Sequence, residues 1–199
     1  MSSASGSASP GPAPWRASFL KNVGDMASPE FNLATLHSAS AAGAVSAVPR
    51  LRTVIFRGLW ASLPVNPKNT ADLNPPVYES DLLTLTTDAR MAKVTAHFGN
   101  LSPAMRGTFR NPEPGASRKA NPADDKHKLG QKVEDLHDEV ARANFRVVVI
   151  VPTEVDQTDL SDAEDPRRWL YRFVGASADG QPTDDAERSN GWEKIELWP

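Results

Sequence analysis

The sequence predicts a β-rich α+β fold. Short apolar or alternating runs bounded by Pro, Gly and Asp recur along the chain, whereas helical spacing occurs in three stretches. The 199 residues suit one domain of ordinary size. Leu, Ile, Val and Phe make up only about a fifth of the chain. We therefore expect a modest core and a large share of loop.

The N-terminus and the middle of the chain differ in composition from the rest. Residues 1–13 carry no charge and are rich in Ser, Ala, Gly and Pro, which predicts a disordered tail. The folded domain is assigned to residues 14–199. Residues 99–128 are rich in Pro, Gly and Asn and are interpreted as a disordered or loop-like insert within it.

Three stretches have helical spacing, namely residues 15–26, 89–98 and 129–143. Trp15, Phe19 and Val23 recur every four residues in the first. Asp88 is a suitable N-cap for the second. The third has the clearest stripe and is predicted to be the best helix; its apolar residues are Leu129, Val133, Leu136 and Val140.

The predicted strands fall at residues 31–36, 50–60, 81–88, 145–151, 167–175 and 192–199. The small-residue run that follows residue 36 is interpreted as a strand, a turn or loop, and a return strand. Residues 145–151 are apolar almost throughout, so we expect a central strand there. Residues 50–60 mix arginine with apolar side chains on both faces.

Charge is spread unevenly along the chain. Residues 50–119 carry ten basic and five acidic side chains, whereas residues 120–199 carry ten basic and eighteen acidic ones. The basic middle indicates either contact with an anion or a solvated face.

Several function classes find no support in the residues. The chain has no cysteine, and its four histidines lack metal-ligand spacing, so no metal site is predicted. No P-loop, GxGxxG or GxSxG motif is present. No apolar run is long enough to span a bilayer, and the N-terminus lacks a secretory core, so we expect a cytoplasmic protein without a membrane partner. Nucleic-acid binding is disfavoured because aromatic residues are sparse in the basic middle.

The remaining candidate chemistry is a basic constellation of Arg52, Arg57, Thr87, Arg90 and Lys93. Guanidinium and ammonium groups beside hydroxyls and a helix start suit a phosphate monoester. Taken by itself, the pattern is a weak signal, and scattered surface charge explains it more readily than a specific phosphate site.

Three stretches resemble the pyridoxamine 5'-phosphate oxidase-like FMN-binding family, in particular its fungal-type branch. They are PRLRTVIFRG (49–58), TDARMAK (87–93) and the closing WEKIELWP (192–199). The stretches NLATL (32–36) and NLSPAMRGTFRNPEPG (100–115) are similar to the same branch. The resemblance implies an FMN-binding split β-barrel that dimerises and binds FMN at the dimer interface.

The resemblance also implies a set of cofactor-binding residues, namely Arg52, Thr53, Val54, Arg57, Thr86, Thr87, Arg90 and Lys93. Arg52 and Lys93 would bind the flavin phosphate, and Arg90 would add positive charge. The strand from Arg52 to Arg57 would pass along the isoalloxazine ring, with Arg57 near the face where substrate enters. Thr86 and Thr87 would line the ring or the ribityl chain.

The sequence departs from the family pattern at three points. Met91 stands where the family has a phosphate-binding serine, and Leu170 stands in the position of a substrate-binding histidine. Lys93 is followed almost at once by HFGNLSP, without the glutamine-bearing stretch that comes between them in the family. The barrel is therefore expected to be incomplete.

Two functions from different classes follow. The first is an FMN-dependent oxidoreductase, a homodimer that acts on an unknown small-molecule substrate, with the flavin carrying the redox chemistry. The second is a degenerate, non-catalytic split barrel that serves as a dimerisation or interaction module. No catalytic side chain is identified.

Overall fold

The computed structural model describes residues 11–41, 44–73, 79–88, 95–120, 122–175 and 185–199. The chain divides into two compact units. One unit comprises Met1–Ala27, Glu79–Leu82 and Val151–Pro199, and the other comprises Ser28–Tyr78 and Leu83–Ile150. We call them the terminal unit and the central unit. The organisation of residues 14–199 as one split-barrel domain stays a prediction.

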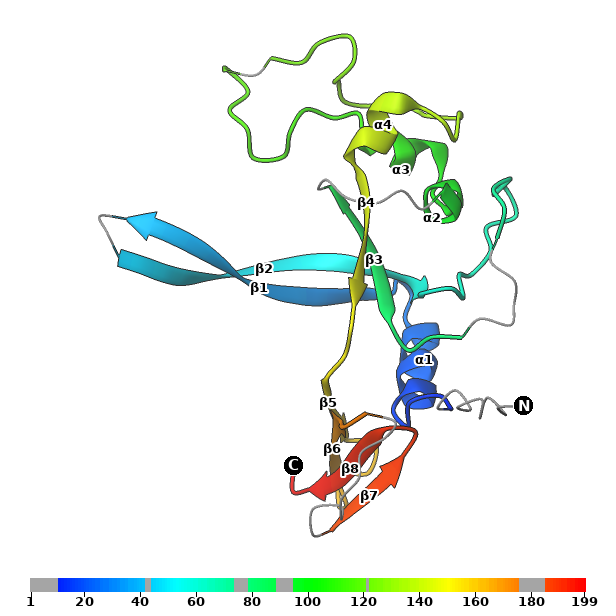
Figure 1. The fold of residues 1–199 in the computed structure, drawn as a ribbon, viewed down its shortest axis with the longest axis vertical. Helices are drawn as coiled ribbons and strands as arrows, with labels where there is room; N and C mark the ends of the chain where they lie inside the picture. The colour runs from blue at the N-terminus through cyan, green and yellow to red at the C-terminus, as the bar shows by residue number, and fades with distance from the viewer. Residues whose placement is uncertain (1–10, 42–43, 74–78, 89–94, 121, 176–184) are drawn as a thin grey trace, which may run out of the picture. The chain divides into compact units, whose positions relative to one another are not determined.

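The central unit is built on one antiparallel sheet. Its strands are β1 (Glu30–Ala41), β2 (Ala44–Leu59), β3 (Leu83–Asp88) and β4 (Phe145–Ile150), in that spatial order. Figure 1 shows β1 and β2 as one long hairpin. The predicted strands on either side of the turn are therefore confirmed, while residues 42–43 of the predicted turn lie outside the described residues.

The terminal unit contains a second antiparallel sheet. Its strands are β5 (Glu154–Asp159), β6 (Arg167–Phe173), β7 (Ala186–Ser189) and β8 (Trp192–Leu197), in the order β5-β6-β8-β7. Strands β6 and β8 were predictable from their apolar alternation. Strand β5 was missed because its sequence EVDQTD is polar and acidic. Its pairing with β6 places Asp156 beside Arg168 and Glu154 beside Arg172.

Helix α1 (Arg16–Asp25) lies in the terminal unit and confirms the first predicted helix. Trp15 precedes it and is almost fully buried, with its ring edge-to-face against Trp192 of β8 at 5.7 Å between centroids. Phe19, one turn later, meets the same indole at 6.1 Å. Aromatic edge-to-face packing thus fixes α1 on the second sheet.

The helices of the central unit are short: α2 (Thr95–Asn100), α3 (Pro103–Thr108) and α4 (Glu139–Asn144). The prediction of a helix over residues 129–143 is wrong, because only its last turns are helical. Gly130 has a φ of +75°, and the N–H of Val133 donates to the carbonyl of Pro103 rather than within a helix. The carboxylate of Asp138 accepts from the N–H of Ala141 and starts α4 there.

The position of β4 in the sheet also differs from the prediction. Among the described pairings β4 hydrogen-bonds only to β3, so it is an edge strand and not a central one. Its run of valines reflects partial burial on both faces of the strand. The apolar sequence indicates that both faces of the strand are partly buried. It does not indicate whether a neighbouring strand pairs along each edge, so the prediction of a central strand was wrong.

The core of the central unit contains three phenylalanines in mutual contact through Phe145. The ring of Phe145 lies edge-to-face against Phe98 and Phe109, each at 5.1 Å. The buried cluster consists of Phe98, Leu101, Phe109, Val133, Ala141 and Phe145. Two antiparallel sheets and few helices confirm the β-rich class, while the pairings of the described residues do not close either sheet into a barrel.

Candidate functional site

Strand β2 carries most of the predicted site. Its run Thr53-Val54-Ile55-Phe56 consists of β-branched and aromatic residues, which favour extended backbone. Strand β1 pairs along one edge of β2, with Leu33 opposite Arg52, and β3 pairs along the other, with Leu85 opposite Phe56. Strand β2 is therefore held in place by hydrogen bonds to a neighbouring strand along each of its edges.

A β-bulge interrupts β2 immediately after this run. Phe56 pairs with Leu85 and Leu59 pairs with Leu83, so two residues of β2, Arg57 and Gly58, lie opposite one residue of β3. Gly58 adopts a φ of +111°, and a Cβ atom there would lie 2.6 Å from Cδ of Pro64. Only glycine suits this position. The bulge also changes the direction in which the side chain of Arg57 projects from the strand.

A cavity of about 530 Å³ borders β2 within the central unit. One wall comes from the strands and the other from α3 and the loop that follows it. Its lining residues are Arg52, Thr53, Val54, Ile55, Arg57, Thr86, Met105, Thr108, Phe109, Asn111, Pro112, Pro114 and Leu129. The volume is within the range of ordinary small-molecule sites.

The strand wall of the cavity is positively charged. Arg52 and Arg57 line it, and none of the described lining residues is a carboxylate. Arg57 is partly buried, its Nε atom has no hydrogen-bond partner, and burial lowers the pKa of its guanidinium. A buried donor without an acceptor is unfavourable unless a ligand or water supplies one. The arrangement therefore favours a ligand with anionic or acceptor atoms.

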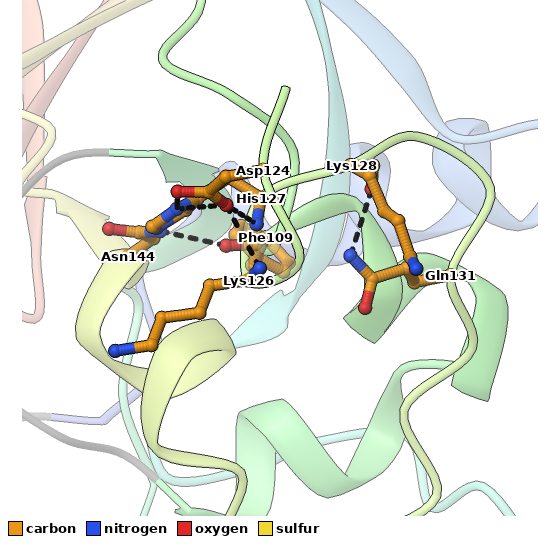
Figure 2. Close-up of polar contacts among 7 residues, drawn as sticks. All are labelled: Phe109, Asp124, Lys126, His127, Lys128, Gln131 and Asn144. Carbon is orange, nitrogen blue, oxygen red and sulfur yellow. Dashed lines mark hydrogen bonds and ion pairs between the residues drawn. The ribbon is translucent and has the colours of Figure 1, made fainter. Parts of the chain in front are cut away.

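The opposite wall is largely apolar and is fixed to the core. The hydroxyl of Ser102 accepts from the N–H of Met105 and caps α3. Phe109 is buried in the core cluster, and its carbonyl accepts a hydrogen bond of 2.9 Å from Nδ2 of Asn144 in α4 (Figure 2). Met105, Phe109, Pro112 and Pro114 thus give this side of the cavity a mainly apolar surface.

The loop that returns to this wall is ordered by local polar contacts, which Figure 2 shows. One carboxylate oxygen of Asp124 accepts from the backbone N–H groups of Lys126, at 2.9 Å, and His127, at 2.5 Å. The bond from the His127 N–H is the main reason that the pKa of Asp124 is lowered. Nε2 of Gln131 donates to the carbonyl of Lys128 at 3.0 Å. These turns lead the chain to Leu129 at the cavity.

The structure brings five of the eight predicted cofactor residues to this one cavity, namely Arg52, Thr53, Val54, Arg57 and Thr86. The hydroxyl of Thr53 also donates to Oδ1 of Asn32 on β1 at 3.1 Å. Thr87 belongs to β3, but its side chain is not described. Arg90, Lys93 and Met91 lie outside the described residues. The predicted roles of all eight stay predictions.

Sequence reasoning did not find the apolar wall. Its members come from α3 and the loop after it, namely Met105, Thr108, Phe109, Asn111, Pro112, Pro114 and Leu129. Most of them lie in the stretch NLSPAMRGTFRNPEPG, which resembles the family without indicating what it contacts. Asn111 is notable because its Oδ1 atom is buried without a hydrogen-bond partner. No local pattern relates these residues to β2, since the contact is tertiary.

Other kinds of site receive no support from the part of the chain that the structure describes. It contains no group of three or more His, Asp or Glu side chains that could hold a metal ion. None of its helices combines the length and the apolarity that crossing a membrane would require.

The comparison with protein families agrees with the cavity. Residues 12–109 match the family model described as pyridoxamine 5'-phosphate oxidase, FMN-binding domain. The match confirms the resemblance of the sequence to this family over these residues. The match includes β1, β2, β3 and α3, and with them the charged wall of the cavity. Neither the curated proteins nor the solved structures include a match to the chain.

Proposed function

We propose that the chain binds FMN in the cavity beside β2. The observation that carries the proposal is the charge of this wall: two arginines, no carboxylate, and a buried Arg57 Nε without an acceptor, all within the family-matched residues. Arg52 would bind the phosphate, and the backbone from Arg52 to Arg57 would follow the ring edge. Thr86, Thr87, Arg90 and Lys93 complete the proposed site.

The residues present fit the flavin in chemical type. Guanidinium groups bind phosphate with paired, charge-assisted hydrogen bonds, and the apolar wall at Met105 and Phe109 suits an aromatic ring system. The bound flavin would supply the redox chemistry of an FMN-dependent oxidoreductase with a small-molecule substrate. The side chains described here would bind and orient it, because no acid or base other than arginine lines the cavity.

FMN titration of the purified protein tests the proposal. We expect a yellow protein, or an apoprotein that binds added FMN, and a loss in affinity of about tenfold or more in Arg52→Ala. Arg50→Ala is the matched control, because Arg50 is an exposed arginine of the same strand that does not line the cavity. Riboflavin, which lacks the phosphate, should bind Arg52→Ala and wild type alike. Colourless protein that fails to bind added FMN would refute the proposal.

A second candidate function is a non-catalytic split barrel that dimerises. The unpaired edge of β4 among the described strands favours it, because an edge strand with half-buried valines can pair with another chain. Light scattering combined with the same titration separates the two functions. A folded dimer without flavin affinity supports the second, and flavin binding supports the first.

A further inference from the structure

The β-bulge next to the cavity is held by one buried side chain. Thr84 of β3 is the single residue opposite Arg57 and Gly58, and none of its surface is exposed. Its hydroxyl donates a hydrogen bond of 2.7 Å to the carbonyl of Gly58. A bulge disrupts the regular strand ladder. Here a side-chain hydroxyl supplies a donor to the Gly58 carbonyl.

Three features hold the backbone at Gly58 in its conformation. The positive φ of Gly58 sets the turn of the strand, Pro64 packs against the place where a Cβ would be, and Thr84 binds the carbonyl. Arg57 directly precedes Gly58, so the direction of its side chain depends on the same backbone. Arg57 is also the residue whose Nε is buried without a hydrogen-bond partner and which lines the cavity.

We propose that Thr84 is a positioning residue that acts through the Gly58 carbonyl to hold the Arg57 guanidinium at the cavity. The inference rests on the proposed function for its effect on ligand binding, in which Arg57 offers its N–H donors to acceptor atoms of the flavin. Thr84 does not line the cavity, so it acts on the ligand only through Arg57.

The test compares Thr84→Val, which keeps the shape and removes the donor, with Thr84→Ser, which keeps the donor. The first readout needs no ligand. It is the rate at which the Nε–H proton of Arg57 exchanges with water, measured by NMR. The signal is assigned by its disappearance in Arg57→Lys. We expect slow exchange in wild type and in Thr84→Ser, and faster exchange in Thr84→Val. Thr84→Ala replaces the valine variant in all assays if the latter does not fold.

The second readout is the FMN dissociation constant in a double-mutant cycle. Thr84→Val should raise it about fivefold in the wild-type background and leave it unchanged in the Arg57→Met background. Thr84→Ser should restore the wild-type value. A merely structural role of Thr84 would weaken binding equally in both backgrounds.

The outcomes distinguish this inference from the proposed function. If wild type fails to bind FMN, the proposed function is wrong, and the exchange rate of Arg57 still decides whether Thr84 positions it. Exchange in wild type as fast as that of an exposed arginine would overturn the inference. Equal effects of Thr84→Val in both Arg57 backgrounds would also overturn it.

Discussion

The buried histidine of the central unit makes stability depend on pH in a calculable way. His97 is 4% exposed, and its ring stacks on Trp60 with 5.7 Å between centroids and 21° between planes. Burial lowers its pKa from 6.5 to about 4, so the folded protein holds it neutral where the unfolded chain takes up a proton. The contribution of His97 to the free energy of unfolding is therefore present above pH 6.5 and is lost as the pH falls from 6.5 toward 4.

The size of this effect follows from the two pKa values. Between pH 7 and pH 5 the His97 contribution to the free energy of unfolding should fall by about 2 kcal/mol. His97→Phe keeps a flat ring against Trp60 and removes the titrating group. Urea unfolding at both pH values should show a loss in wild type that exceeds the loss in His97→Phe by this amount. An equal loss in the two proteins would refute the reasoning, as would an NMR titration of His97 with a midpoint near its ordinary value.

Two further predictions concern stability. Phe98→Ala should lower the free energy of unfolding by about 3–5 kcal/mol in urea, because Phe98 is 1% exposed at the centre of the core cluster, whereas Leu36→Ala at an exposed site should change it little. Arg188→Met should cost about 2 kcal/mol by the same measurement, since it leaves the buried Glu193 carboxylate without the 2.6 Å contact to Arg188. Arg168→Met, which removes an exposed ion pair, is the control and should have little effect; equal losses in the two arginine variants would contradict the burial argument.

The sequence predicted those parts of the fold in which local pattern and burial agree. The β-branched run of β2 and the spacing of Trp15, Phe19 and Val23 each predicted the right element. In both cases an apolar residue of the pattern is buried, Phe56 in the strand and Trp15 at the start of the helix. The stripe of Leu129, Val133 and Leu136 gave the wrong one. Val133 is buried in the core, but an irregular segment carries it there, and Leu129 is 66% exposed.

Some residues of the candidate site were predicted from the sequence, and others were not. Arg52 and Arg57 were found from the sequence because basic residues within an apolar strand are unusual and because the motif resembles a family. Thr84 and Phe109 were not, since their importance depends on contacts with residues distant in sequence. The bulge at Gly58 arises from pairing with β3, and one strand alone does not reveal it.

The loop at residues 110–132 joins two halves of one core, and this has a consequence for chain connectivity. Phe98, Leu101 and Phe109 precede the loop, whereas Val133, Ala141 and Phe145 follow it. The cavity residues of the loop lie near its two ends, at Asn111 to Pro114 and at Leu129. The stretch between Pro114 and Leu129 connects the two halves of the core without lining the cavity. A protease cut there should therefore leave two fragments that stay associated through buried aromatic packing. Inserting residues into this stretch should cost the fold little, because each doubling of loop length adds only about 0.6 kcal/mol of closure entropy.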